Sequence, residues 1–273
     1  MTEPIRPSPQ EEALLKSEGL DTVAGAFDYR GGENLSKPGL AGRERLRLNL
    51  TDEAGKPVQW YLKRYGGAHA GHGPSQCCCP LPAGRPSPAR CELENIRLVE
   101  AAGVPTMRPL AFGEATNMWG RQRSYLVVAA VAGEALERCF DDFLARNADN
   151  EAALAAFNAA LIQLVARLHS AGLVHRDLYA SHVFLEDTPT GPKLYLIDLA
   201  RVFKPRWRRF RWRVKDLAQL KYSMPSKWAE HHWREFLEMY LARIGGWPRR
   251  WARAIDRKVA AMRRRRRRKE NAG

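Results

Sequence analysis

The feature that most constrains the fold is a long helix followed at once by a loop and a strand pair. The apolar positions of residues 151–171 recur with helical spacing, and Asn150 and Gly172 can cap the two ends of this helix. The loop LVHRDLYASHVFL (173–185) and the strand LYLIDLARV (194–202) come next. An apolar stripe of this length predicts a helix packed into a core, with the loop at its end.

The two strands of this segment bring chemical groups together. A hairpin that pairs residues 183–186 with residues 194–197 would place His182 and Asp198 side by side at the strand ends. Asp177 lies in the loop just before the hairpin. Two carboxylates and an imidazole therefore converge. Phosphoryl transfer needs such a set, because one carboxylate orients the attacking hydroxyl and another holds the magnesium that bridges the phosphates.

The tripeptide His175–Arg176–Asp177 is weak by itself. These can be ordinary loop residues, with Asp177 capping a turn. The amphipathic helix before them and the strand that ends in Asp198 favour the phosphotransfer interpretation.

These motifs resemble the lipopolysaccharide core kinases (the Kdo and heptose kinases) of the protein-kinase-like superfamily. HRDLYASHVFL resembles their catalytic loop, and IDLARV resembles their metal-binding strand. RWRVKDLAQLKYS (211–223) resembles their next helix, and LVEAAGVPTMRPLAFGE (98–114) the link from the helix of the N-terminal lobe to the following strand. The resemblance runs in patches from about residue 37 to residue 222.

The resemblance implies roles for individual residues. Asp177 would be the catalytic base, Asp198 the Mg²⁺ ligand and Arg176 an internal ion-pairing residue. Asp216 would lie in a helix beneath the loop and hold its backbone. Protein kinases have an Asn where this chain has His182. We expect His182 beside Asp198 at the metal site. Because imidazole is a poor ligand for Mg²⁺, the alternatives are that His182 contacts a phosphate or that one metal ion suffices.

A kinase also needs a lysine for the α- and β-phosphates of ATP and a glutamate that orients it. The pattern of residues 45–50 and 58–65 predicts a β-hairpin, and Lys63 lies in its second strand. The alternative is a solvated lysine on an edge strand. Glu92 and Glu94 compete for the partner role, and we favour Glu92 because helical spacing puts it on the apolar face.

Two further expectations for the nucleotide site rest on position alone. KPGLAGRE (37–44) would cover the phosphates, with Gly39 and Gly42 permitting close backbone approach. It lacks the glycine pattern of protein kinases. Ala129 and Val131 would mark the hinge that exchanges backbone hydrogen bonds with adenine.

Strands dominate before about residue 132 and helices dominate after it, which predicts an α+β, two-lobed protein-kinase-like fold. Its N-lobe would be an antiparallel sheet plus one helix, and its C-lobe mainly helical. We expect a disordered leader (1–24), a nucleotide-binding N-lobe (25–132) with a mobile insert (66–88), and a catalytic C-lobe (133–246). A basic amphipathic helix and polyarginine tail (247–273) would follow.

The composition fits a cytosolic protein. No secretory signal core is visible at the N-terminus, and five cysteines, three of them adjacent, suit a reducing compartment. Two histidines and three cysteines of the insert invite a zinc interpretation, but their spacing matches no common zinc site.

The positive charge is concentrated at the C-terminal end. Residues 201–273 contain 24 Lys/Arg and 6 Asp/Glu, a balance of +18. A helix over 247–262 would align apolar residues beside six arginines (263–268), a pattern typical of an anionic membrane contact. A helix docked on the C-lobe with a solvated tail and a nucleic-acid contact are the alternatives.

The sequence thus predicts an ATP-dependent kinase for a sugar hydroxyl of a lipopolysaccharide-like glycolipid, peripheral on the cytoplasmic face of the inner membrane. Its expected partners are ATP, Mg²⁺, an anionic glycolipid or sugar acceptor, and an anionic membrane surface. A kinase for a soluble sugar, choline or aminoglycoside is one alternative. A catalytically inactive scaffold that binds membrane or nucleic acid is the other.

Overall fold

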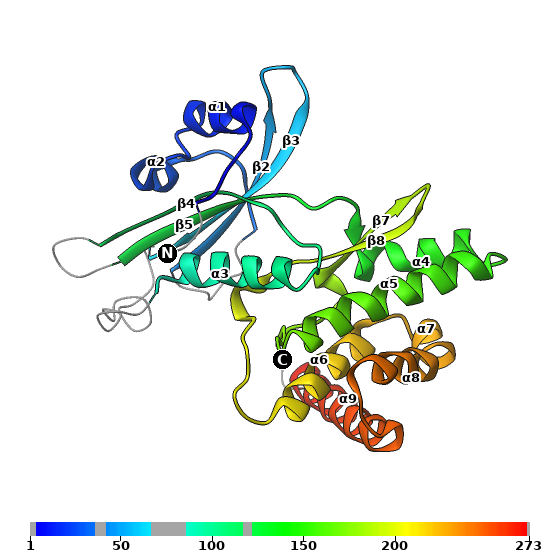
Figure 1. Cartoon of the computed structure of the whole chain (residues 1–273). Helices are drawn as coiled ribbons and strands as arrows, with labels where there is room; N and C mark the ends of the chain where they lie inside the picture. Colours follow the sequence, from blue (N-terminus) through cyan, green and yellow to red (C-terminus); the bar gives the residue numbers. More distant parts are fainter. Residues whose placement is uncertain (1–3, 36–41, 67–85, 117–121, 272–273) are drawn as a thin grey trace. The chain divides into compact units, whose positions relative to one another are not determined.

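The computed structural model describes residues 4–35, 42–66, 86–116 and 122–271 (Figure 1). The chain forms two compact units. The first comprises residues 1–97 and 107–130, and the second residues 98–106 and 131–273. The expected fold class is confirmed, with an antiparallel sheet in the first unit and a mainly helical second unit.

The first unit is built on an antiparallel sheet with the strand order β1-β2-β3-β5-β4. Its strands are β1 (Glu33–Asn34), β2 (Arg43–Thr51), β3 (Pro57–Tyr65), β4 (Pro109–Thr116) and β5 (Gln122–Ala129). The β2–β3 hairpin closes through Asp52, whose carboxylate accepts the N–H groups of Ala54 (3.0 Å) and Lys56 (2.8 Å). Gly55 supplies the positive φ of 76° that this turn requires.

The expectation of a disordered leader is wrong for the described part of residues 1–24. Helix α1 (Pro9–Ser17) begins with a capping box between Ser8 and Glu11, and α2 (Val23–Asp28) follows. Leu15 and Leu20 are buried in the same cluster as residues of β2 and β3. Burial of these leucines against the sheet offsets the entropy of ordering the segment, which composition alone did not indicate. The first unit therefore has more than the one helix expected.

Helix α3 (Pro88–Ala101) belongs to the first unit up to Arg97, and one face of this part is buried. Leu93 and Ile96 are buried there. The guanidinium of Arg90 donates to the carboxylate of Glu114 on β4 (Nε–Oε1 3.0 Å), which fixes α3 against the sheet. The expected insert precedes this helix, and residues 67–85 lie outside the described residues.

The second unit combines a small antiparallel sheet with six α-helices among its described residues. The sheet order is β6-β7-β8, with β6 (Glu134–Ala135), β7 (Val183–Thr188) and β8 (Gly191–Leu196). The helices are α4 (Leu136–Arg146), α5 (Glu151–Ser170), α6 (Arg209–Ser223), α7 (Ser226–His231), α8 (Trp233–Ile244) and α9 (Pro248–Glu270). The short 3-10 turns η1 (Ala180–His182) and η2 (Leu199–Arg201) flank the β7–β8 hairpin.

Helix α5 is the central helix of the second unit. The side chain of Asn150 accepts the N–H of Ala153 at its start, and Gly172, with φ 79°, follows its end. Among the described helices it alone is long and apolar enough to cross a membrane by length and composition. Phe157, Leu161 and Val165 are instead fully buried inside the unit, as expected of a core helix.

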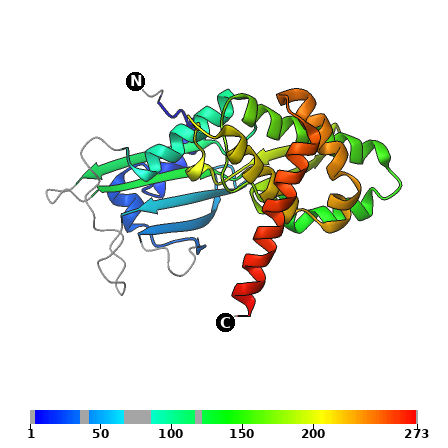
Figure 2. The same ribbon diagram turned by 90° about the horizontal axis from the view of Figure 1, so that it is seen from below.

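The apolar stripe of the C-terminal helix is not free to enter a membrane. Helices α6 and α9 lie side by side (Figures 1 and 2), and the ring of Trp251 packs on that of Phe210 with centroids 4.8 Å apart. Ile255 and Val259 are buried as well. Residues 247–273 therefore belong to the second unit, and the docked-helix alternative is correct for this stripe. Burial against α6 removes the apolar contribution that membrane insertion would need.

Trp251 in α9 and Trp247, the residue directly before α9, allow a matched test of this packing. Trp251 is 5% exposed and Trp247 is 79% exposed. We expect Trp251→Ala to lower the free energy of unfolding by about 3–5 kcal/mol, since a large buried ring is lost. Trp247→Ala should change it by about 0.5 kcal/mol or less. Urea unfolding of both variants measures this. Equal effects would show that α9 is not docked on α6.

Candidate functional site

The loop between α5 and β7, residues 173–182, is held from beneath by one carboxylate. We call these residues the HRD loop. Asp216 on α6 is fully buried, and its two oxygens accept the backbone N–H groups of His175 (2.7 Å) and Arg176 (2.8 Å). This is the placement expected for Asp216. The carboxylate fixes the backbone immediately before Asp177.

Two buried histidines complete this support. His169 lies between Tyr240, whose hydroxyl is 2.6 Å from Nδ1, and Asp216, 3.3 Å from Nε2. His175 places Nε2 2.9 Å from the carbonyl of Ile197. Burial lowers the pKa of both His169 and His175, although the nearby Asp216 carboxylate acts in the opposite direction. Both rings are therefore neutral in the folded protein at neutral pH.

Asp177 reaches the surface between two cations that sequence reasoning did not identify. Arg201 on η2 donates Nη1 to both carboxylate oxygens, at 2.8 Å and 3.1 Å. The ammonium of Lys215 on α6 is 4.0 Å from Oδ1 of the carboxylate and donates to the carbonyl of Arg176. The only sequence signals were their positions, three residues after Asp198 and one before Asp216.

The β7–β8 hairpin places His182 and Asp198 together, as the expected pairing required. Val183 pairs with Leu196, and the His182 Nε2 to Asp198 Oδ2 distance is 3.7 Å. The other ring nitrogen, Nδ1, is 2.7 Å from the carbonyl of Asp177. A carbonyl can only accept, so Nδ1 of His182 donates to the carbonyl of Asp177, and Nε2 is the ring nitrogen that lies nearer Asp198.

This pair fits a magnesium ion whose coordination is completed by a ligand. Asp198 offers the oxygen that Mg²⁺ prefers, and His182 offers a poorer nitrogen. Among the described residues, no group of three or more His, Cys, Asp and Glu side chains could hold a metal. Phosphate oxygens and water would therefore supply most of the coordination sphere, as is common for Mg²⁺ in phosphotransfer sites.

Arg176 makes no ion pair with a residue that the structure describes, whereas the resemblance implies one. Its guanidinium lies 5.5 Å from the ring centres of both Phe203 and Trp212. Its backbone has φ 72°, which is unusual for a residue with a side chain. The two hydrogen bonds to Asp216 and the two aromatic contacts together hold this conformation, so Arg176 shapes the loop through cation–π contacts.

The first unit places Lys63 and Glu92 in a buried ion pair. Lys63 on β3 is 6% exposed and Glu92 on α3 is fully buried, and the Lys63 ammonium donates to Oε1 of Glu92. The hydroxyl of Tyr65 donates to Oε2 at 2.7 Å. Burial and the Glu92 carboxylate raise the pKa of Tyr65 well above its usual value. Glu92, rather than the half-buried Glu94, is thus the partner of Lys63.

The other residues expected at the nucleotide site are Gly39, Gly42, Ala129 and Val131. Gly39 lies outside the described residues. Gly42 has φ 78°, and its carbonyl accepts the N–H of Gly66. The N–H of Ala129 donates to the carbonyl of Arg108 at 2.9 Å, so adenine cannot use that donor while this bond holds. Val131 begins the main segment of the second unit.

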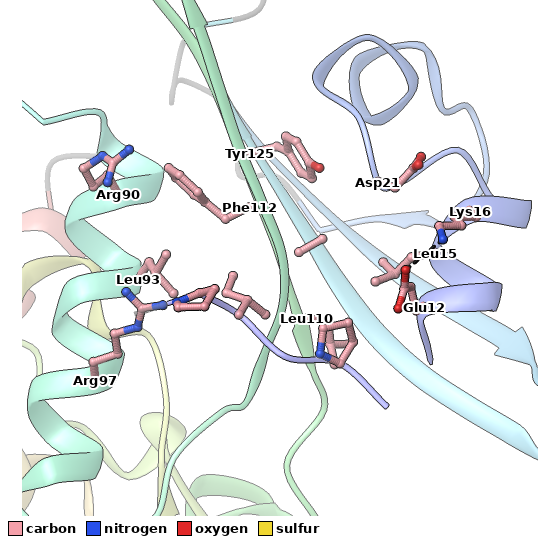
Figure 3. A pocket seen from close by; sticks show the side chains of 14 residues that line it. Glu12, Leu15, Lys16, Asp21, Arg90, Leu93, Arg97, Leu110, Phe112 and Tyr125 are labelled. Carbon is pink, nitrogen blue, oxygen red and sulfur yellow. Dashed lines mark hydrogen bonds and ion pairs between the residues drawn. The ribbon is translucent and has the colours of Figure 1, made fainter. Parts of the chain in front are cut away.

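A cavity of about 590 Å³ in the first unit lies away from these residues (Figure 3). Leu15 of α1, Leu93 of α3 and Tyr125 of β5 contribute to its walls. The N-terminal residues Pro4 and Pro7 also line it. None of the residues expected at the site lines this cavity.

Comparison with known proteins points to one family. A family model described as "Lipopolysaccharide kinase (Kdo/WaaP) family" matches residues 49–240. The lipopolysaccharide core heptose(I) kinase WaaP of Pseudomonas aeruginosa is 34% identical over 139 residues. That match covers 50% of this chain and 52% of the relative, so the chain spans about half the length of this curated protein.

A solved structure is similar over nearly the whole chain. It is described as WaaP in complex with acyl carrier protein. It is 25% identical, with a TM-score of 0.65, and the likeness covers 97% of this chain and 98% of that chain.

The neutral buried histidines make the stability of the second unit depend on pH. Their folded pKa values are lowered, so below about pH 6.5 the unfolded chain binds protons that the folded chain does not. We expect the free energy of unfolding to fall as the pH drops below 6.5, by at most about 1.4 kcal/mol per pH unit for each histidine. Urea unfolding between pH 7.5 and 5 measures this slope.

Matched variants assign the slope to the buried ring. His169→Gln should flatten the pH dependence, whatever its effect on stability at pH 7.5. His231→Gln, which changes an exposed histidine of α7, should leave the slope unchanged. A slope that is the same in all three proteins would contradict the assignment.

Proposed function

Because the chain belongs to the lipopolysaccharide kinase (Kdo/WaaP) family, we propose that it is an ATP-dependent kinase that phosphorylates a sugar hydroxyl of a lipopolysaccharide-like glycolipid. The observation that carries the proposal is the HRD loop. Asp216 fixes the backbone of this loop, and the last residue of the loop, His182, lies 3.7 Å from Asp198.

Asp177 would orient the acceptor hydroxyl and take its proton as the phosphoryl group is transferred. The bifurcated contact from Nη1 of Arg201 holds the carboxylate in one orientation, and the Lys215 ammonium lies 4.0 Å from Oδ1 of the same carboxylate. The two cations also offer positive charge close to the place where the phosphoryl group would arrive. They would thereby stabilise the charge on its oxygens.

Each unit, taken by itself, contains residues suited to binding a nucleotide. The Lys63 ammonium, oriented by Glu92, is suited to the α- and β-phosphates of ATP. Asp198, with His182 beside it, would hold Mg²⁺, which would neutralise negative charge on the phosphates. Gly39, Gly42, Ala129 and Val131 remain predictions for this nucleotide site.

We further propose that the protein works as a peripheral protein on the cytoplasmic face of the inner membrane. Trp207 is 81% exposed and Trp247 is 79% exposed, and arginines 263–268 are exposed. Exposed tryptophan suits the headgroup region of a bilayer, and clustered arginine suits anionic lipid. These residues, rather than the buried stripe of α9, support the membrane contact.

The assignment of Asp177 and Asp198 predicts two different defects. Asp177→Asn should lower turnover by about 10²-fold or more while nucleotide binding persists, because only the base is lost. Asp198→Asn should remove Mg²⁺-dependent nucleotide binding, because it removes the carboxylate that would hold the metal. Turnover with a glycolipid acceptor, together with calorimetric nucleotide binding, distinguishes the two.

Asp187→Asn is the control for both variants, because Asp187 is a partly exposed carboxylate on β7. It should behave as the unmodified protein does. If Asp177→Asn turned over acceptor at the normal rate, Asp177 would not be the base. Unchanged Mg²⁺-dependent binding in Asp198→Asn would remove the metal assignment.

The membrane proposal is tested by substitution, because deletion of residues 247–273 would expose the buried face of α6. Each arginine near an anionic surface contributes about 1 kcal/mol. We expect the change of arginines 263–268 to Gln to weaken binding to anionic liposomes at least tenfold in low salt. Trp207→Ser with Trp247→Ser should weaken it further. Cosedimentation with anionic and neutral liposomes gives the answer, and equal capture by both liposomes would argue against the proposal.

A further inference from the structure

Helices α6 and α9 enclose a groove along the second unit. The two helices run in parallel. Phe210 near the start of α6 packs on Trp251 near the start of α9, and Tyr222 near the end of α6 lines a pocket with Arg266 near the end of α9. Between them is a cavity of about 370 Å³. A volume of this order can hold one sugar unit with an anionic substituent.

The groove is strongly cationic and carries aromatic walls. It is lined by Phe210, Arg211, Trp212, Val214, Lys215, Ala254, Arg257, Lys258 and Ala261. Four of these side chains are basic and none is acidic. Within the described part of the chain, no carboxylate pairs with Arg211, Arg257 or Lys258. Like charges gathered without a partner repel one another, and an anionic ligand would relieve that repulsion.

The groove is continuous with the HRD loop through two of its lining residues. Lys215 donates its ammonium to the carbonyl of Arg176 and approaches Asp177 to 4.0 Å. Trp212 packs against the guanidinium of Arg176 at 5.5 Å. A ligand in the groove would therefore lie within one side-chain length of the carboxylate that we propose as the base.

We infer that this groove binds an anionic sugar unit of the acceptor, with its phosphate or carboxylate contacting Arg257 and Lys258. The rings of Trp212 and Phe210 add aromatic lining to the groove, although Arg176 and Trp251 already contact them. The acceptor hydroxyl of a neighbouring sugar would then be presented to Asp177. This inference rests on the proposed kinase function and adds to it the place and the charge of the acceptor subsite.

Binding of simple sugars tests the groove without any turnover. The full chain should bind glucose 6-phosphate or glucuronic acid in calorimetry, and should bind glucose at least tenfold more weakly. The two anionic sugars separate a phosphate preference from a carboxylate preference. The double variant Arg257→Gln with Lys258→Gln should lose at least tenfold in affinity for the preferred sugar.

A matched variant controls for the loss of charge. Arg249→Gln with Arg253→Gln removes the same charge from exposed positions of α9 that do not line the cavity. It should bind the anionic sugar as the unmodified protein does. The inference is overturned if the two double variants lose equal affinity, or if the groove variant loses none. It is also overturned if binding of single-stranded nucleic acid or anionic liposomes, but not of sugars, depends on Arg257 and Lys258.

Steady-state kinetics with a glycolipid acceptor separates this inference from the proposed function. The groove variant should raise the acceptor KM at least tenfold and leave kcat and the ATP KM unchanged, since it touches neither Asp177 nor the nucleotide residues. An unchanged acceptor KM overturns the inference while the kinase function stands. If the unmodified protein phosphorylates no acceptor, the proposed function fails, and sugar binding alone then decides the groove.

Discussion

The second unit depends on one buried carboxylate. Asp216 is fully buried, and a carboxylate taken out of water costs several kcal/mol unless hydrogen bonds replace its hydration. Here the N–H groups of His175 and Arg176 provide them, with the His169 ring as a third neighbour. Arg176, next to Asp177, has an unusual positive φ, and these hydrogen bonds hold that conformation. They therefore help to fix the position of Asp177.

Helix α6 also connects the HRD loop to the surface of the second unit. Its inner face carries Asp216, while Trp212 and Lys215 of the same helix contact Arg176 and approach Asp177. Its outer side packs on α9 through Phe210. One helix therefore joins the loop of the proposed base to the most basic segment of the chain. A change in how α9 docks would reach Asp177 through side chains that touch one another.

Much of the candidate site could be predicted because its spacing is local. Residues 183–186 and 194–197 can pair only as a hairpin, so His182 and Asp198 come together whatever surrounds them. Glu92 was preferred over Glu94 by helical spacing, and the structure pairs it with Lys63. Arg201 and Lys215 lie inside two of the quoted motifs, but no role was assigned to them, because only the packing of η2 and α6 brings them to Asp177.

The sequence by itself determined the strand hairpins, the α5 helix, the HRD loop and the concentration of charge after residue 200. Periodicity and turn residues act over a few positions, and each of these features needs no more than that. Only the tertiary structure decided which apolar faces would be covered. Leu15 and Leu20 are buried against the sheet and so order the N-terminal segment. Ile255 of α9 is buried inside the second unit, so it is not available to a membrane. An apolar stripe specifies burial but not its partner, since the hydrophobic effect has no direction.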